Sequence, residues 1–335
     1  MVNRVLHFFR PRCLGFRGFL LSAGVVAAVA TTATLAAQGT EPGGPLQLVS
    51  STYCEDECCE EEEDERKCYG PCCCQERGTL LQWSYGTSFS GGPDLEEPLV
   101  TDRPDFTESS VTVGRGVAQL EAGYTYLYDT EAGTSVKTHS YPEMLWRIGM
   151  LAEWFELRIG WNYLEETTTV AGAPMSVRGS DDLLVGGKFA LTPQECLLPE
   201  MALIVQMTVP SGTTGISAEE VLPGVNWLYS WEVNDYLSIA GSSQGFRSVD
   251  DTGEFHFVFA QSMSAAVSLT ETVGAYAEWF ALFPSGAATA PTEHFFNGGF
   301  TYLVNNDIQL DVRAGTGLNS AATDYFAGTG FSVRF

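Results

Sequence analysis

The sequence predicts an all-β protein: a transmembrane antiparallel up-and-down β-barrel of about 12 strands, preceded by a disordered N-terminal extension. Three observations predict this fold. Apolar and polar residues alternate over residues 117–335, the alternating runs have about nine to eleven residues, and turns separate them. Residues 308–314 show the alternation best, because every second side chain is apolar. Successive side chains of a strand point to opposite faces, so this period indicates one apolar and one polar surface.

The composition fits a β-rich body and argues against other classes of protein. The chain contains 35 Gly, 20 Phe and 13 Tyr, which suits many tight turns between aromatic-rich strands. Mean hydropathy is neutral, at +0.00, and this argues against a bundle of transmembrane helices. A formal net charge of −25 argues against a nucleic-acid partner, whose phosphates attract clustered Lys and Arg.

Residues 1–37 have the features of a signal peptide that directs export. An apolar core at residues 19–30 precedes small residues around Ala36, where cleavage would follow. The basic region ahead of the core contains Arg4, Arg10, Arg12 and Arg17. An uncleaved signal anchor is the alternative. Together with a barrel, export predicts a location in the cell outer membrane, with outer-membrane lipid and the barrel assembly machinery as partners.

Residues 38–77 form an acidic, cysteine-rich segment that we expect to be disordered, because it has little apolar mass to bury. Its seven cysteines are Cys54, Cys58, Cys59, Cys68, Cys72, Cys73 and Cys74. Their spacing differs from the paired C-x2-C motifs of a zinc site, so disulfides formed after export are the leading interpretation. Binding of a soft metal by thiolates is the second. The odd number leaves a free thiol or an intermolecular bridge, unless Cys196 pairs.

Residues 78–116 are punctuated by Gly and Pro and predict a periplasmic lead-in or plug segment before the first strand. The charged residues at its centre are Asp102, Arg103 and Asp105. They are candidates for a plug or latch, in which Arg103 pairs with an acid of the lumen such as Glu121 or Glu143. The alternative is a local structural role in a turn fixed by Pro104.

Residues 117–335 form the predicted outer-membrane barrel. The alternating segments are 117–128, 139–151, 155–163, 182–191, 200–209, 223–231, 236–245, 255–266, 273–282, 295–304, 307–318 and 324–335. Their connections are alternately long and short, as in bacterial outer-membrane barrels with short periplasmic turns. This pattern predicts long outer loops at residues 164–181 and 210–222 and places both ends of the barrel on the periplasmic side.

Aromatic and aliphatic residues define one face of the strands, and charged residues define the other. A charge at the lipid midplane would cost about 2–4 kcal/mol for Arg or Lys, so the charged face is expected to line the lumen. The candidate lumen residues are Glu121, Glu143, Arg147, Glu156, Arg158, Asp182, Lys188, Glu200, Glu278, Asp311, Arg313 and Arg334. These acids and bases nearly cancel, which predicts weak cation selectivity. A soluble barrel would alternate in the same way; the export signal, aromatic strand ends and terminal Phe335 favour the membrane.

Several stretches resemble a known family. They are residues 101–109 (TDRPDFTES), 119–124, 156–160, 182–188, 199–200, 298–302, 309–315 and 331–335. Through them, residues 98–335 resemble a family of outer-membrane transporters labelled "MetA-pathway of phenol degradation". The resemblance implies a β-barrel with a role in the passage of small compounds, aromatic ones among them, and Phe335 resembles the C-terminal sorting signal of outer-membrane proteins.

We therefore predict an outer-membrane channel for passive passage of a small-molecule solute, with aromatic or apolar compounds among the candidates and no cofactor. The alternative is a structural or surface-interaction barrel anchored through its Cys-rich acidic tail. A barrel lipid hydrolase is a third class. His139 and Ser140 are adjacent, but adjacent strand residues face opposite ways and no third group supports a catalytic triad, so no enzyme is expected.

Overall fold

The computed structural model describes residues 59–62, 65–68, 79–81, 95–194, 197–250, 252–287 and 289–335. The chain forms two units, Met1–Cys73 and Cys74–Phe335. In the first, β1 (Cys59–Glu62) and β2 (Glu65–Cys68) form an antiparallel hairpin in which Cys59 lies opposite Cys68. This hairpin lies within the segment expected to be disordered. The signal peptide, the other five predicted thiols and Cys196 lie outside the described residues, so their predicted roles stay predictions.

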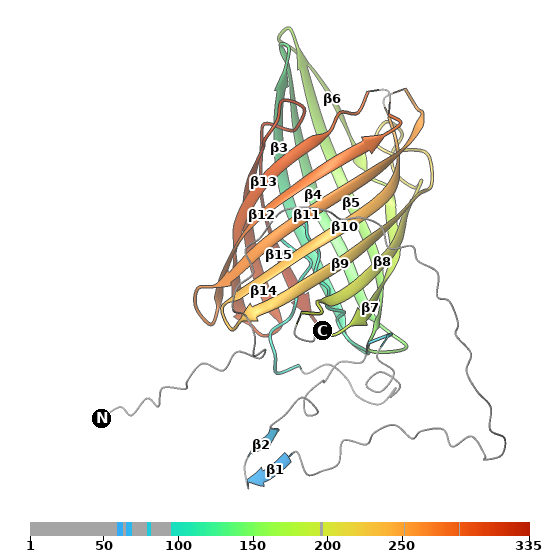
Figure 1. Ribbon diagram of the computed structural model, residues 1–335. Helices are drawn as coiled ribbons and strands as arrows, with labels where there is room; N and C mark the ends of the chain where they lie inside the picture. Colours follow the sequence, from blue (N-terminus) through green and yellow to red (C-terminus); the bar gives the residue numbers. More distant parts are fainter. Residues whose placement is uncertain are drawn as a thin grey trace, which may run out of the picture. The chain divides into compact units, whose positions relative to one another are not determined.

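The second unit is a closed antiparallel β-barrel (Figure 1). Thirteen strands form one sheet, and a further pairing between β4 and β5 closes 12 of them into a ring. The ring strands are β3 (Ala118–Glu131), β4 (Thr134–Gly149), β5 (Phe155–Val170), β7 (Leu183–Thr192), β8 (Glu200–Val209), β9 (Leu222–Asn234), β10 (Leu237–Val249), β11 (Phe255–Ser268), β12 (Val273–Ser285), β13 (Glu293–Asn305), β14 (Ile308–Gly317) and β15 (Tyr325–Arg334). The predicted fold and strand number are confirmed.

Two strand pairs are longer than the alternation predicted. The expected outer loop at residues 164–181 is wrong, because β5 continues to Val170 and the additional strand β6 (Ala173–Ser180) pairs back along it. Likewise, β3 and β4 continue to a two-residue turn. Both turns have the sequence Ala-Gly with positive φ at each residue: 49° and 87° in the β3–β4 turn, 51° and 84° in the β5–β6 turn. Such turns match the twist of two long strands, so they extend the hairpins.

The other connections follow the predicted alternation of lengths. Residues 235–236 and 306–307 are tight turns, whereas residues 210–221 and 318–324 are longer loops. Before the barrel, the amides of Leu80 and Leu81 bond to carbonyl groups of Ala190 and Leu191 at 2.9 and 3.0 Å. The segment at residues 79–81 thus touches the end of β7 without forming a strand.

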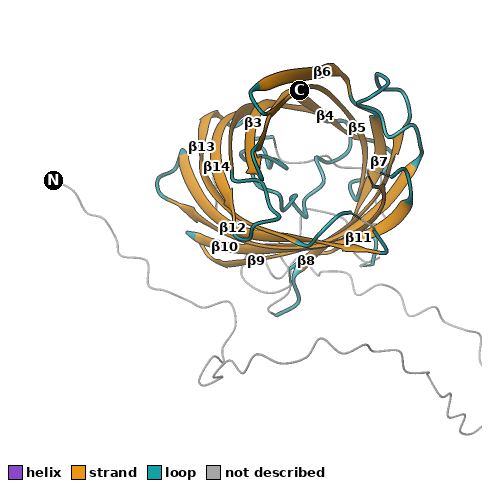
Figure 2. Ribbon diagram, turned by 90° about the horizontal axis from the view of Figure 1, so that it is seen from above, coloured by secondary structure: helices purple, strands orange, loops and turns teal. Residues whose placement is uncertain are grey.

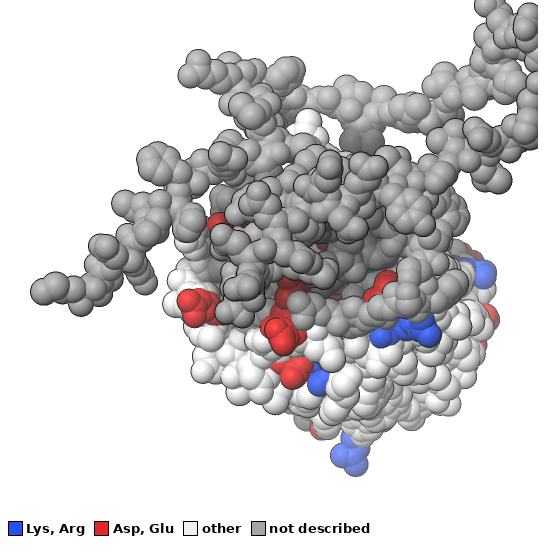
Figure 3. All heavy atoms as spheres, turned by 90° about the horizontal axis from the view of Figure 1, so that it is seen from below, with Lys and Arg blue, Asp and Glu red and all other residues white. Residues whose placement is uncertain are grey.

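The outer surface of the barrel is apolar. Many of the large side chains that point outward are at least 40% exposed, among them Trp227, Phe257, Met263, Phe300, Val312 and Phe331. Figure 3 shows mostly uncharged atoms over the visible flank, with charged atoms near the rim. An exposed apolar surface of this kind is the lipid-facing band of a transmembrane barrel.

The described residues include no helix that is long and apolar enough to cross a membrane.

The inner surface combines buried charges with two apolar patches. Arg147, Arg158, Lys188, Glu121 and Glu156 are at most 1% exposed, although they are charged. One apolar patch consists of Ala202, Ile204 and Leu228. The other consists of Phe280, Phe295, Ala322 and Phe326, with Phe106, Leu127 and Leu282 packed against it. Inward side chains with so little exposure must be covered by another part of the chain. Part of the chain therefore lies inside the barrel.

Candidate functional site: a segment inside the barrel

The inserted segment, residues 99–113, occupies much of the lumen. Figure 2 shows loop chain running inside the ring of strands. At one end, the Leu99 amide bonds to the Asn306 carbonyl oxygen at 2.7 Å. At the other, the Val113 amide donates to the Glu156 carboxylate at 2.9 Å, on the inward face of β5. The residues between these ends bond to inward side chains of most of the barrel strands.

Asp102 is the centre of a buried ionic cluster. Its carboxylate accepts hydrogen bonds from Lys188 Nζ at 2.7 and 3.0 Å and forms ion pairs with Arg147, at 3.4 Å, and with Arg158. Its backbone amide donates to both carboxylate oxygens of Glu121, at 3.0 and 3.1 Å. These partners belong to β3, β4, β5 and β7, so one residue of the inserted segment bridges four neighbouring strands.

The charges in this cluster are tolerated because each has partners of opposite sign. Arg147 donates to Glu156 at 2.9 and 3.0 Å and to Glu121 at 3.1 Å. Burial alone would raise the pKa of Asp102, but Arg147, Lys188 and Arg158 outweigh burial and hold that pKa below its usual value. Burying ions costs several kcal/mol each even when they are paired, so the cluster mainly fixes where the segment lies.

Arg103 extends from the inserted segment in another direction. Its guanidinium forms ion pairs with Glu143, at 3.0 Å, and with Asp311 of β14, at 3.2 Å. Gly123 and Gly330 lie against the guanidinium, and a Cβ atom at either position would collide with it. Of the two acids considered from the sequence as partners of Arg103, the structure therefore places Glu143 beside it, whereas Glu121 binds the Asp102 amide.

Glu278 of β12 holds the next part of the segment. Its carboxylate accepts hydrogen bonds from the amides of Phe106 and Thr107, both at 2.7 Å, and from the Thr107 hydroxyl at 2.6 Å. The Phe106 ring stacks on Phe280 with 4.4 Å between centroids and 6° between planes, and Phe280 stacks in turn on Phe295 at 4.6 Å. Backbone and side chain of one residue are thus fixed by two different interactions.

The last part of the segment lies against other strands of the wall. Glu108 pairs with Arg158 and accepts a hydrogen bond from Asn226 of β9 at 2.9 Å. The Ser110 hydroxyl donates to Glu200 of β8 at 3.2 Å. These contacts cover the inward side of β8 and β9, which carries the small patch of Ala202, Ile204 and Leu228.

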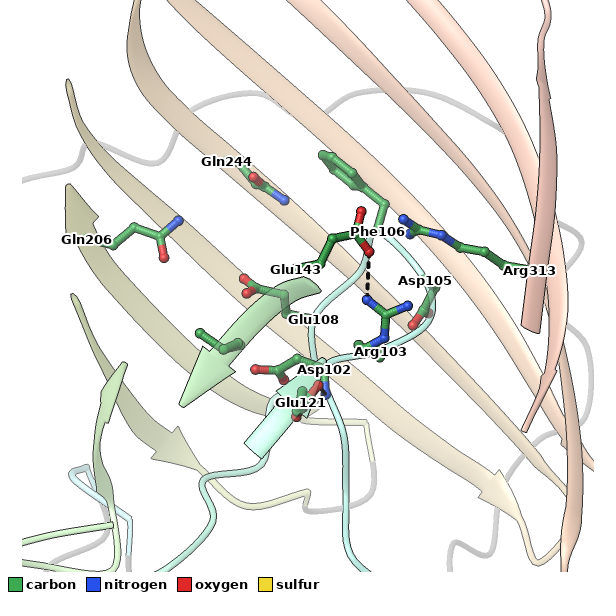
Figure 4. A pocket seen from close by; sticks show the side chains of 11 residues that line it. Asp102, Arg103, Asp105, Phe106, Glu108, Glu121, Glu143, Gln206, Gln244 and Arg313 are labelled. Carbon is green, nitrogen blue, oxygen red and sulfur yellow. Dashed lines mark hydrogen bonds and ion pairs between the residues drawn. The ribbon is translucent and has the colours of Figure 1, made fainter. Parts of the chain in front are cut away.

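A cavity lies beside the inserted segment (Figure 4). Its volume is about 340 Å³. The segment forms one wall, and β3, β4, β8, β10 and β14 contribute the rest. The lining residues are Asp102, Arg103, Asp105, Phe106, Glu108, Glu121, Glu143, Leu145, Gln206, Gln244 and Arg313. A solute passing through the lumen would meet this cavity and the segment beside it.

Ten of the twelve candidate lumen residues bond to the inserted segment or form ion pairs with it. They are Glu121, Glu143, Arg147, Glu156, Arg158, Lys188, Glu200, Glu278, Asp311 and Arg313. Of the three plug candidates, Asp102 and Arg103 are ion-paired to the wall, and Asp105 lines the cavity. The side chains expected to line an open path therefore mostly hold the segment.

The other two candidates lie away from the inserted segment. Asp182 accepts hydrogen bonds from the amides of Ser211, Gly212 and Ala218, all at 3.0 Å, and so orders the loop at residues 210–221. Arg334, next to the end of the chain, donates to the carbonyl groups of Leu95 and Glu97 at 2.8 and 2.9 Å. It therefore holds the chain that leads into the inserted segment.

The inward aromatic cluster was missed from the sequence, although a signal for it exists. Phe280 is two residues from Glu278 and Phe295 is two residues from Asn297, so both aromatic residues occupy positions of the polar face. Aromatic residues on that face indicate a filled lumen. Phe106 lies within the 101–109 stretch, but nothing in that stretch shows which residues its ring packs against.

Phe335 and His139 lie at the outer surface. Phe335 is 67% exposed, and its backbone exchanges hydrogen bonds with Ala118 at 2.8 and 3.3 Å. His139 accepts or donates a hydrogen bond with the Tyr124 hydroxyl at 2.8 Å, whereas Ser140 bonds to Asn162. The sorting role of Phe335 stays a prediction.

Comparison with known proteins gives one family and several solved barrels. An outer membrane channel from Pseudomonas putida F1 matches with a TM-score of 0.54 and 10% identity, over 70% of this chain and 99% of that one. The NanC porin matches with a TM-score of 0.41 and 10% identity, over 64% and 98%. A KdgM porin matches with a TM-score of 0.38 and 11% identity, over 64% and 99%. No curated protein matches the sequence.

At these identities the Pseudomonas putida structure shows a shared fold. The family model described as "Putative MetA-pathway of phenol degradation" matches residues 101–335, which include most of the inserted segment and the whole barrel. The predicted resemblance is confirmed, and the chain belongs to this family.

Proposed function

We propose that the protein is an outer-membrane channel for passive passage of small molecules, without covalent chemistry, whose lumen is narrowed by the inserted segment. An apolar exterior and an ionic interior support a membrane barrel with an aqueous path. The fold shared with an outer membrane channel supports the same function. The observation that carries the proposal is the cavity of about 340 Å³ left between the segment and the wall.

The charges in the lumen favour cations. The acids within the inserted segment or bonded to it are Asp102, Asp105, Glu108, Glu121, Glu143, Glu156, Glu200, Glu278 and Asp311. The bases are Arg103, Arg147, Arg158, Lys188 and Arg313. The segment itself adds three acids and one base, so the excess of acids is larger than the twelve wall residues alone indicated. A narrow path of one sign concentrates counter-ions of the other.

Planar-bilayer recording of the Arg103→Ala variant tests the proposal. Removing the guanidinium leaves Glu143 and Asp311 without their partner, so we expect the segment to loosen, conductance to rise and cation preference to increase. The matched control is Arg115→Ala, because Arg115 is exposed beyond the end of the segment. Unchanged conductance and selectivity in Arg103→Ala would count against the segment as the constriction.

Liposome swelling identifies the solute class. Purified full-length protein in liposomes is exposed to sugars, amino acids and aromatic acids of similar size. A solute that swells the liposomes faster than its size predicts has a favourable site in the lumen.

A structural or surface-interaction barrel is the second candidate, and two observations favour it. The inserted segment fills much of the lumen, and the β3–β4 and β5–β6 hairpins project at one end of the barrel (Figure 1). Absence of conductance in both the natural protein and the Arg103→Ala variant would favour this candidate over a channel.

A further inference from the structure

The charges that face the cavity are not all neutralised. Asp102 and Glu121 are paired to bases of the wall, and Glu143 is paired to Arg103. Two lining residues of opposite sign differ from them. Among the described residues, neither Asp105 nor Arg313 forms an ion pair, with each other or with any other group. The cavity is therefore lined by one acidic and one basic side chain that are not engaged in ion pairs.

Arg313 is held in place by neutral groups. Its Nη1 donates to the Pro104 carbonyl oxygen at 2.8 Å, and its Nη2 donates to the Thr125 hydroxyl at 2.9 Å. Its Nε is buried and has no hydrogen-bond partner among the described residues. A guanidinium held in this way keeps its full charge available to an anionic group.

Asp105 is the acidic residue of this pair. It follows Pro104 in the inserted segment, and it lies near Glu278 and Ser264. Burial raises the pKa of Asp105 and the neighbouring Glu278 raises it further, whereas a hydrogen bond from Ser264 and the charge of Arg313 lower it by less. A positive group of a ligand would relieve both effects. The ring of Phe106, fixed by its stack on Phe280, lines the same cavity and offers an apolar surface next to the two charges.

We propose that this cavity binds a small zwitterion, a free amino acid, with its ammonium group at Asp105, its carboxylate at Arg313 and its side chain against Phe106. The proposal rests on the channel function above and names the class of solute. The volume of about 340 Å³ lies at the lower end of the range for ligand pockets, so it fits one small molecule.

A singly charged ligand satisfies only half of the site. An organic acid would meet Arg313 but would bring no positive charge to Asp105, within a lumen that has an excess of acids. An organic amine would meet Asp105 and leave Arg313 unpaired. Discrimination by unpaired polar groups of this kind is strong, because the group left without a partner has also lost water.

Three solutes that share one skeleton test the proposal: phenylalanine, phenethylamine and 3-phenylpropanoate. Binding to the full-length protein in detergent is measured as the rise in unfolding temperature with ligand concentration. Uptake into liposomes is measured in parallel. We expect phenylalanine to bind about tenfold more tightly than either analogue, as one charged hydrogen-bonded contact is commonly worth that factor.

The variants Asp105→Asn and Arg313→Gln assign the two contacts. Asp105→Asn should weaken phenylalanine and phenethylamine but not 3-phenylpropanoate, whereas Arg313→Gln should weaken phenylalanine and 3-phenylpropanoate but not phenethylamine. Thr125→Val removes one hydrogen bond of Arg313 and keeps its charge, so it controls for loosening of the segment. Gln244→Ala is an uncharged control in the lining. If a variant does not fold, the ranking of the three solutes on the natural protein decides.

Two results would overturn the proposal: an analogue that binds the natural protein as tightly as phenylalanine, or variants that weaken all three solutes alike. Binding of phenylalanine without any conductance would instead contradict the channel function and leave the site intact. Conductance without preference for phenylalanine would contradict only the site.

Discussion

The inserted segment is held on two opposite sides of the barrel by different chemistry. On the side of β4, β5 and β7, Asp102 lies in a buried network of charges. On the side of β12 and β13, the amide and ring of Phe106 are fixed by Glu278 and a stack of aromatic rings. The strand order places β12 six strands from β5 in either direction around the ring, so these two sides face each other.

The charged side and the aromatic side contribute differently to the position and to the stability of the inserted segment. Buried ion pairs add little net free energy, but breaking one is costly, so the charged side fixes the register of the segment. Stacked apolar rings gain free energy from burial and tolerate small shifts. The charged side therefore fixes the position of the inserted segment, whereas the aromatic side can tolerate small displacements.

The largest effect is expected on the charged side. Asp102→Ala removes one of the two carboxylates that Arg147, Arg158 and Lys188 share and leaves Glu156 alone among them, so the loss in free energy of unfolding should be about 3–5 kcal/mol. Urea unfolding in lipid vesicles, followed by tryptophan fluorescence, measures it. The control is Asp307→Ala, because Asp307 is 53% exposed and pairs with Arg334, an interaction worth less than about 1 kcal/mol. Equal losses in both variants would show that the cluster does not have this role.

A smaller effect is expected on the aromatic side. Phe106→Ala removes a half-buried ring from the stack and should lower the free energy of unfolding by roughly 2–3 kcal/mol. Phe106→Leu keeps most of the apolar area and loses only ring stacking, worth about 0.5–1.5 kcal/mol. The same unfolding measurement compares them. If Phe106→Leu lowers the free energy of unfolding as much as Phe106→Ala does, the stabilisation does not come from burial of apolar area.

The smallest effect is expected at Asp182, which does not contact the inserted segment. Burial would raise the pKa of Asp182, but hydrogen bonds from Ser217 and from the amides of Gly212, Ala218 and Ser211 lower it below the ordinary 3.8. The charged form therefore stabilises the loop at pH values above 3.8, and this contribution is lost as the pH falls through the lowered pKa. Protease sensitivity of the 210–221 loop should rise in Asp182→Asn at neutral pH. A loop equally resistant in this variant would refute the role.

The barrel could be predicted from the sequence because its period is local. Alternation over residues 308–314 requires only that neighbouring side chains face opposite ways, and the same rule placed the charged residues inside. The extended hairpins were missed because Ala-Gly was not recognised as the turn of a two-residue hairpin.

The site could be predicted only in part, because its contacts join residues far apart in the chain. The composition around Arg103 indicated a partner in the lumen, yet Asp311 is 208 residues away. Which acid meets which base depends on the register of the closed barrel. The stack beneath Phe106 depends on where the inserted segment folds back, and no periodicity encodes that.

The most direct test of the central claim is a cross-link between the segment and the wall. The hydroxyl groups of Thr107 and Ser262 are 2.6 Å apart. The double variant Thr107→Cys, Ser262→Cys is oxidised in native membranes, and its peptides are analysed by mass spectrometry. We expect a disulfide-linked pair of peptides that contain positions 107 and 262. Free thiols at both positions that react with a water-soluble maleimide would contradict a segment held inside the barrel.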